Sequence, residues 1–301
     1  VQTCRQSGLS IVFQELLDFG GDEIYFQEES RLIGRDFGDA LLAYPTSTVI
    51  GLADAAGRVR LNPPMATPIA AGDRIIAISA DDDTVRLDES GTAVDETAIR
   101  EAVDGEERPE RTLVLGWSSR LPLVLRELAH YVAAGSTATV VVDPEAAARA
   151  RELSLPAFER LAVRVAEGDI TDRRTLVALD VASYDHVILL SDLELPEQQA
   201  DARTLLTLLH LRDLREREGT AVSLVSEMRD VRNCELAAVT RADDFIVGDR
   251  LVSLLLTQIA ENPLLHPVFD DLFDPEGSEI YLKPAAAYVE LGRPVTFATV
   301  V

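Results

Sequence analysis

The sequence has few of the residues that mark disulfide-bonded, membrane-spanning or nucleic-acid-binding proteins. It contains two cysteines, Cys4 and Cys234, and their wide separation gives neither a disulfide framework nor a metal-ligand spacing. No apolar run reaches the roughly 18 residues that a membrane span needs, and no signal peptide is present. Lys283 is the single lysine. These absences favour a globular protein whose two thiols are buried and reduced.

The charge is strongly one-sided. The chain has 28 basic and 52 acidic residues, for a net charge of −24. No basic footprint for nucleic acid is present, so DNA and RNA are not expected as ligands, and an anionic membrane surface is disfavoured. The charge favours cations, either as a diffuse cloud or as bound divalent ions. A GC-rich genome or adaptation to high salt produces the same composition, so the acidity by itself defines no site.

One pattern occurs twice, at Val12–Tyr25 and at Val268–Tyr281, with an offset of 256 residues and eight identities in fourteen positions. This period is far too long for a solenoid, so we interpret the pattern as a duplicated module with a whole domain between its copies. The chain begins with Val1 rather than methionine, and the module that contains the second copy stops at Val301. We therefore expect the sequence to be a piece of a longer protein.

Hydrophobic periodicity predicts a small α+β module over residues 1–82. A helix is expected over Gly8–Asp18 and a strand over Asp22–Phe26, followed by a short helix and three more strands. Residues 83–110 are acidic and almost free of large apolar side chains, which is typical of a solvated linker.

Strands and helices alternate over residues 111–262. Six apolar runs predict strands, namely TLVLGW, ATVVVD, LAVRVAEGD, DHVILLSD, AVSLVSE and DDFIVGD. Near-continuous apolar strands indicate a sheet that is covered on both faces. The fold class predicted is therefore α/β, with a Rossmann-like, doubly wound parallel sheet flanked by small α+β modules. The second such module begins at residue 263 and is cut short at residue 301.

The first turn of this sheet departs from the dinucleotide-binding fingerprint. The fingerprint G-x-G-x-x-G would place glycines at three positions, but the chain reads Gly116-Trp117-Ser118-Ser119-Arg120-Leu121 and keeps only the first. We therefore expect neither NAD nor another nucleotide in the standard pose. The following helix still offers free N–H groups, and a cap from Ser118 or Ser119 is the simpler interpretation of these serines.

Three aspartates follow successive strands, and they carry the ligand prediction. Asp143, Asp169 and Asp192 are expected at one rim of the sheet, where their oxygens could bind a hard cation. Three independent helix caps would explain them as well, and both interpretations stay open. The predicted ligand-binding set also contains Ser191 and a floor formed by Gly116, Trp117, Ser118 and Ser119. The predicted metal ligands are the three aspartates.

Enzyme constellations are missing. The sequence has no G-x-S-x-G elbow, no P-loop lysine and no H-E-x-x-H motif. The four histidines are scattered without ligand spacing. The sequence therefore predicts a protein that is not an enzyme.

The order of parts resembles the tandem RCK domains (regulators of potassium conductance) that form channel gating rings and TrkA-type transporter subunits. In detail the sequence resembles the CASTOR/POLLUX ion-channel family and its bacterial relatives. The runs that carry the resemblance are LGWSSRLPLVLRELAHYVAAGS, HVILLSD with DARTLLTLLHLRDL, SLVSEMRDVRN and ADDFIVGDRLVSLLLTQIAENP. In this frame, residues 1–82 are the C-terminal subdomain of a first RCK domain, and residues 111–262 are the Rossmann subdomain of a second.

The resemblance implies a function and a setting. It implies a homo-oligomeric, tetrameric ring that couples ligand binding, often of Ca²⁺, to the opening of a cation pore. That pore would lie upstream in the same protein, and this region would be a cytoplasmic domain at a prokaryotic plasma membrane. A TrkA-like regulatory subunit of a potassium transporter is one alternative. A soluble NAD-dependent oxidoreductase is the other, although the missing glycines weigh against it.

Overall fold

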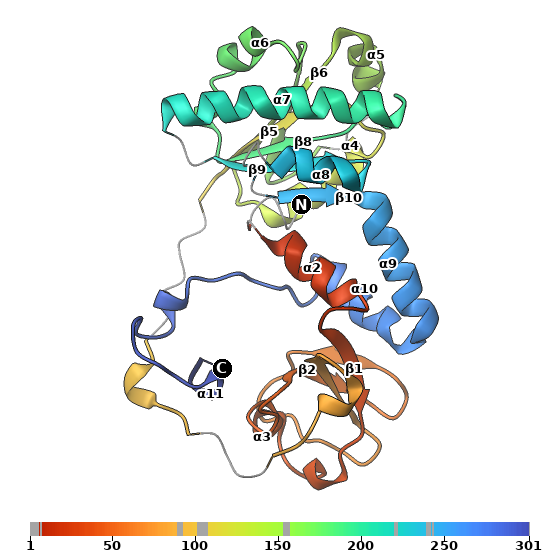
Figure 1. Cartoon of the computed structure of the whole chain (residues 1–301), viewed down its shortest axis with the longest axis vertical. Coiled ribbons are helices and arrows are strands. Elements are labelled where there is room, and N and C mark those ends of the chain that lie inside the picture. The colour runs from red at the N-terminus through yellow and green to blue at the C-terminus, as the bar shows by residue number, and fades with distance from the viewer. Residues whose placement is uncertain are drawn as a thin grey trace. The chain divides into compact units, whose positions relative to one another are not determined.

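The computed structural model describes residue 6 and residues 8–88, 93–100, 108–152, 157–219, 222–238, 242 and 244–300 (Figure 1). The chain divides into two compact units. The first, which we call the Rossmann unit, comprises Val1–Ser10 and Glu106–Ser253. The second, which we call the repeat unit because it contains both copies of the repeated pattern, comprises Ile11–Gly105 and Leu254–Val301. No helix within the described ranges is long and apolar enough to cross a membrane.

The Rossmann unit is built on the six-stranded parallel sheet that the sequence predicted. Its order is β10-β9-β8-β5-β6-β7, with β5 beside both β6 and β8. This order is that of a doubly wound sheet, which reverses its direction of growth next to the first strand. The strands are β5 (Arg111–Leu115), β6 (Ser136–Val142), β7 (Leu161–Glu167), β8 (His186–Leu189), β9 (Ser223–Met228) and β10 (Asp244–Val247).

Helices cover both faces of this sheet, which is why its strands are almost continuously apolar. On one face, Leu121, Leu125 and Leu128 of α4 pack into a buried cluster that Ala146 and Ala147 of α5 complete. The opposite face buries side chains of α6, α7 and α8, and the long helix α7 crosses the sheet in Figure 1. The helices are α4 (Leu121–Tyr131), α5 (Pro144–Glu152), α6 (Arg173–Ala178), α7 (Glu197–Glu218) and α8 (Val231–Ala238). The helix α9 (Gly248–Glu261) begins in the Rossmann unit and ends in the repeat unit.

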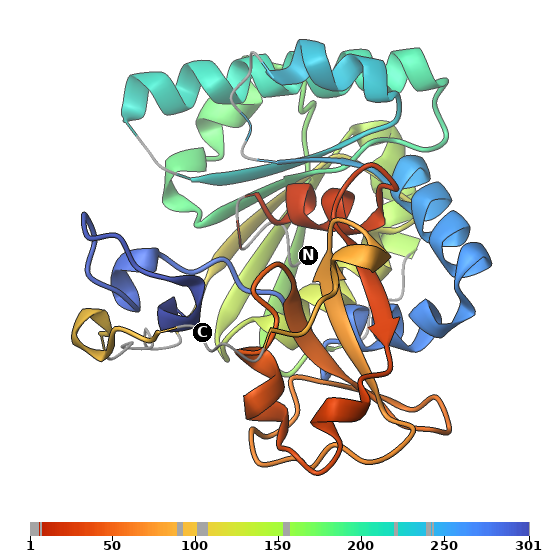
Figure 2. The ribbon, with the colours of Figure 1, turned by 60° about the horizontal axis from the view of Figure 1, so that its bottom comes forward.

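The repeat unit contains a four-stranded antiparallel sheet in the order β1-β4-β2-β3, drawn from red to orange in Figure 2. Phe37, Leu52 and Ile75 are almost fully buried at the centre of its core. The elements of this module are α2 (Leu9–Leu17), β1 (Glu23–Gln27), α3 (Phe37–Leu41), β2 (Thr48–Ala53), β3 (Val59–Leu61) and β4 (Arg74–Ser79). The second copy of the pattern contains most of α10 (His266–Phe273), and α11 (Phe297–Val300) lies closer to the C-terminus.

The two copies of the pattern build the same helix end. The carboxylate of Asp18 accepts a hydrogen bond from the Gly20 N–H, and that of Asp274, 256 positions later, accepts one from Glu276, both at 3.0 Å. A side chain at Gly21 or at Gly277 would lie 2.6 or 2.1 Å from the backbone oxygen of the helix six residues earlier. Both turns therefore require glycine, and the repeat encodes a local turn.

After this turn the copies differ. In the first copy, Ile24 and its neighbours form β1 by pairing with β4, with Ile24 opposite Ile78. In the second copy, residues 278–284 form no strand. A strand needs a hydrogen-bonding neighbour, and in the first copy β4 is that neighbour. The pattern thus fixes the helix and turn, while the strand depends on a distant partner.

The described part of residues 83–110 is mostly exposed, but it also makes contacts that a purely solvated linker would lack. Val85 is 2% exposed and belongs to the core of the repeat unit. Ala98 is fully buried, and Ile99 forms an antiparallel bridge with Val289. The Arg100 N–H donates to the Tyr288 carbonyl at 2.7 Å. Hydrogen bonds such as that from the Asp95 N–H to the Thr299 hydroxyl also connect residues 93–100 with residues 288–299 (Figure 2).

Cysteine makes little contribution to the fold. Cys234 is a free, half-buried thiol whose pKa is raised by burial. Cys4 lies outside the described residues, so the expectation of two buried thiols is met only in part.

Candidate functional site

The three predicted aspartates line one cleft of the Rossmann unit. Asp143 follows β6, Asp169 follows β7 and Asp192 follows β8, so all three lie where the carboxyl ends of the parallel strands meet. The cleft has a volume of about 520 Å³. Its other lining residues come mainly from α5 and α7, and they are Pro144, Glu145, Ala146, Arg149, Glu194, Leu195, Gln199 and Arg203. The sequence therefore placed the three carboxylates correctly, and their role as ligands stays a prediction.

Each aspartate already has a hydrogen-bonding partner within the chain. Asp143 accepts from the Arg203 guanidinium at 2.5 Å. Asp169 accepts from the N–H and the hydroxyl of Thr171, at 2.9 and 2.6 Å. Asp192 accepts from the Glu194 N–H at 2.9 Å. Two of the three thus stabilise their own turns, and Asp143 forms an ion pair. The alternative of three helix caps is not met by Asp169 or Asp192, because Asp172 is the N-cap of α6 and Pro196 that of α7.

These residues do not fit a calcium ion in their present arrangement. Ca²⁺ takes about six to eight oxygen ligands. Asp143 is committed to Arg203, and Arg149 adds a second positive charge to the lining. Across the residues that the structure covers, no group of three or more histidine, cysteine, aspartate or glutamate side chains is arranged to hold a metal. The arrangement gives the predicted metal set of Asp143, Asp169 and Asp192 no support.

The residues predicted to form the floor of the site make up the turn after β5, and this turn is tightly packed. Gly116 has φ +93°, and a Cβ there would lie 2.6 Å from the Leu190 carbonyl oxygen. Trp117 is 5% exposed, and its Nε1 donates to Glu194 at 3.2 Å. The Arg149 guanidinium lies 5.5 Å from the centre of the Trp117 ring, as in a cation–π contact. The indole and the chain itself thus fill the place where a pyrophosphate would approach the backbone.

The serines of the predicted site do not line the cleft. Ser118 is fully buried, and its Oγ accepts from the Arg120 N–H at 3.3 Å. Ser119 is exposed. The expected cap of α4 by either serine is wrong, because Arg120 holds the cap position without a side-chain cap bond. Ser191 is also fully buried, and its N–H donates to Glu227 at 3.2 Å.

Sequence reasoning did not predict that Arg149, Glu194 and Arg203 line the cleft. Arg203 lies within the D-A-R-T-L-L run that carried the family resemblance. Arg149 forms an ion pair with Glu194 beside the buried indole. A charged residue on a predicted helix is usually solvated, so neither arginine stood out. Arg203 could have been found by asking why a basic residue interrupts an apolar run.

The positive charge of Arg203 lowers the pKa of all three rim carboxyls. Burial raises the pKa of Asp143 and of Asp192, and Arg203 opposes that effect at both carboxyls. At Asp169 the Thr171 hydroxyl is the main cause of a lowered pKa, and Arg203 lowers it further.

We expect Arg203→Gln to raise the pKa of all three rim carboxyls, because the shared positive charge is lost. Arg149→Gln is the matched control, since Arg149 lowers the pKa of Asp192 alone among the three. Carbon-13 NMR titration of the carboxyl signals measures both effects. Unchanged titration of Asp143 in Arg203→Gln would contradict the observed ion pair.

Comparison with solved structures gives the class of protein that this fold defines. The human SLO3 gating ring covers 90% of this chain with a TM-score of 0.62 and 13% sequence identity, and the match spans 59% of that chain. At this identity the likeness shows the fold alone. The chain has the fold of an RCK gating-ring unit, as the sequence predicted.

Sequence comparison gives the relatives of the chain. Residues 1–95 match the family model described as "Castor and Pollux, part of voltage-gated ion channel". The "Probable ion channel CASTOR" of Oryza sativa subsp. japonica is 26% identical over 99% of this chain. The "Ion channel POLLUX" of Lotus japonicus is 27% identical over 96% of it. The chain is therefore homologous to the CASTOR and POLLUX ion channels, and it spans 37% and 35% of the length of these two relatives.

Proposed function

We propose that this chain is the ligand-sensing, cytosolic gating-ring region of a cation channel. The observation that carries the proposal is homology to ion channels over almost the whole chain, together with a gating-ring fold. These relatives are ion channels rather than enzymes. The absence of an enzyme motif from the sequence agrees with the further proposal that the chain has no catalytic activity.

The setting of this region is proposed from the same relatives. Gating-ring folds suggest a multimeric ring attached to a pore, and we propose a tetrameric ring of identical subunits whose pore lies in the same protein. A cytosolic location follows from that arrangement. The two relatives described above come from plants, so the prokaryotic plasma membrane expected from the sequence has no support from them.

The cleft at the rim of the Rossmann unit is the proposed sensing site. Its five carboxylates and two guanidiniums give it a negative balance with local positive charge. A ligand that bears positive charge would compete with Arg203 for Asp143 and so release the start of α7 from the end of β6. Such a ligand opens or closes a pore only if it binds one ring conformation better than the other. A coupling of about 1–3 kcal/mol is typical of such systems.

The first experiment asks which ligand the cleft accepts. Thermal unfolding of this chain is followed with Ca²⁺ and with NAD(H) as the two probes, because a ligand present at about 100 times its Kd adds about 2.7 kcal/mol of stability. Because Asp143 is paired with Arg203, Ca²⁺ can use this carboxylate only once Arg203 has left it. We therefore expect Arg203→Gln to increase any stabilisation by Ca²⁺, with Asp213→Asn on the same helix as the control. A large stabilisation by NAD(H) and none by Ca²⁺ would overturn the account of the closed first turn and favour an oxidoreductase.

The second experiment asks whether the region gates a pore. The complete protein that carries this sequence is placed in planar bilayers, and its open probability is recorded with Ca²⁺ on the side of the ring. We expect Arg203→Gln to shift the Ca²⁺ concentration for half-maximal response by about fivefold or more. A complete protein that lacks membrane spans and conducts nothing would instead favour the TrkA-like subunit.

A further inference from the structure

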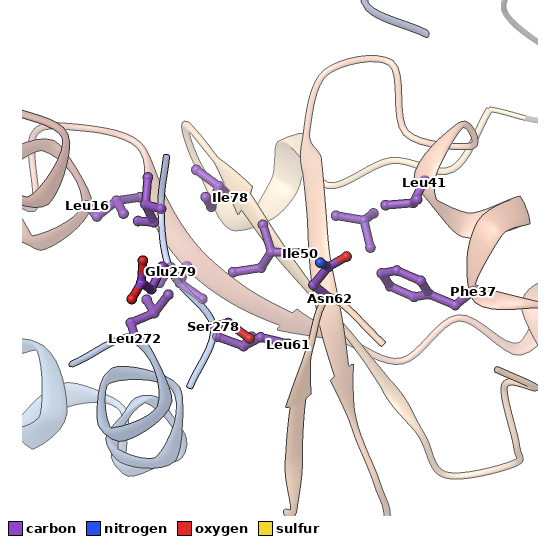
Figure 3. A pocket seen from close by; sticks show the side chains of 13 residues that line it. Leu16, Phe37, Leu41, Ile50, Leu61, Asn62, Ile78, Leu272, Ser278 and Glu279 are labelled. Carbon is purple, nitrogen blue, oxygen red and sulfur yellow. The ribbon is translucent and has the colours of Figure 1, made fainter. Parts of the chain in front are cut away.

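A second cavity lies wholly within the repeat unit, and neither the ligand cleft nor the gating proposal uses it. Its volume is about 260 Å³ (Figure 3). Ten of its thirteen lining side chains are apolar, and they come from α2, α3, α10 and all four strands of the sheet, together with Ile280. A concave, mostly apolar wall with a few polar groups is the usual make-up of a small-molecule site.

The two copies of the repeated pattern contribute equivalent residues to this cavity. Leu16 and Leu272, which are 256 positions apart, both line it, and each is 5% exposed. Ile24 and Ile280 form a second equivalent pair. Ile24 is held in β1, whereas Ile280 belongs to the segment that forms no strand. The second copy therefore contributes apolar side chains to the same cavity as the first, although its segment forms no strand.

A cavity of this kind favours an apolar occupant. Because ten of the thirteen lining side chains are apolar, covering them with the apolar surface of a ligand is favourable. The β2 residue Ile50 lies at a register shift of the β2–β4 ladder, between Val49 and Gly51. Figure 3 shows the Ile50 side chain between the Leu16 side of the cavity and the Leu41 side. The bulge thus turns an extra apolar side chain into the space rather than into the core.

The polar residues that line the cavity indicate which polar group a ligand would carry. They are Asn62, Ser278 and Glu279, and no lysine or arginine lines the cavity. Asn62 has φ +41°, a left-handed conformation that is rare outside glycine, and its N–H donates to the Ile50 carbonyl at 2.8 Å. The Asn62 amide and the Ser278 hydroxyl can donate or accept, whereas the Glu279 carboxylate only accepts, so a donor or a positive charge is favoured beside it. A carboxylate on the ligand would be repelled by Glu279.

We propose that this cavity is a binding site for a small amphiphile with an apolar body and an ammonium or hydroxyl head. The site is independent of the Rossmann cleft, so the proposed gating function can fail without affecting it. The apolar body fills the space beside Ile50 and Leu272, and the head lies at Glu279.

The test uses this chain labelled at the isoleucine methyl groups and titrated with octylamine, octanol and octanoate. We expect saturable shifts of the Ile50 and Ile78 signals, while those of Ile170 and Ile188 in the Rossmann unit stay unchanged. Octylamine should bind about two- to fivefold more tightly than octanol, as an exposed ion pair allows, and octanoate should bind most weakly. Glu279→Gln should remove the preference for the amine.

Ile50→Phe fills the cavity and should abolish the saturable shifts at Ile78. Ile33→Phe is the matched control, because Ile33 is exposed in the same unit and does not line the cavity. Should Ile50→Phe fail to fold, Leu41→Phe tests the same space from α3. Shifts that do not saturate, or that persist in both cavity-filling variants, would overturn the proposal. Equal binding of the amine and the carboxylate would overturn the assigned head group.

Discussion

Replacing Asp201 with alanine is expected to lower the free energy of unfolding of the Rossmann unit by about 3 kcal/mol. Asp201 is 1% exposed in α7. Its carboxylate accepts from the N–H groups of Arg229 and Asp230, both at 2.9 Å, and from the Asn233 amide at 2.7 Å. One side chain thus holds the turn between β9 and α8 against α7. Alanine leaves three donors without their acceptor, and leaving buried donors unsatisfied costs more than a formed hydrogen bond contributes.

Urea unfolding followed by tryptophan fluorescence measures this loss. Trp117 is the single tryptophan and is buried in the Rossmann unit, so the signal reports that unit. Asp213→Ala is the matched control, because Asp213 lies on the same helix but forms only exposed ion pairs with Arg173 and Arg217. We expect the control to change the midpoint little. Equal midpoints for the two variants would show that the buried network contributes nothing specific.

Replacing Gly116 with alanine is expected to cost about 2–5 kcal/mol, from two additive causes. A non-glycine residue at φ +93° is strained by about 1–2 kcal/mol. The new methyl group would also lie 2.6 Å from the Leu190 carbonyl oxygen, and overpacking of this kind costs about 1–3 kcal/mol. Because this oxygen is backbone next to the end of β8, relief requires β5 and β8 to move apart.

Gly135→Ala separates the two causes. Gly135 has φ +89°, but a Cβ there would find its nearest neighbour, Pro109, at 3.6 Å. The control therefore carries the strain without the clash and should lose only about 1–2 kcal/mol. Urea unfolding of both variants gives the difference, and a shift in Trp117 emission should accompany Gly116→Ala alone. An equal loss in both would mean that the closed first turn adds nothing to stability.

Much of the fold was accessible from the sequence because local patterns encode it. The alternation of apolar strands with amphipathic helices predicted the parallel sheet, and the runs ending at Asp143, Asp169 and Asp192 predicted one shared rim. The serine caps of α4 were wrong, and the burial of two side chains in the expected linker was missed for a physical reason. A few apolar side chains, such as Val85 and Ala98, are buried by distant segments that local composition does not reveal.

The sequence by itself determined the order of the strands and helices, the loss of the dinucleotide fingerprint and the position of the repeated helix and turn. Those features depend on side chains a few residues apart and on backbone conformation. The tertiary structure alone decided that Arg203 pairs with Asp143, that Trp117 closes the first turn, and that Leu16 and Leu272 share a cavity. These contacts join residues far apart in the chain, so they depend on the packing of whole elements rather than on any local pattern.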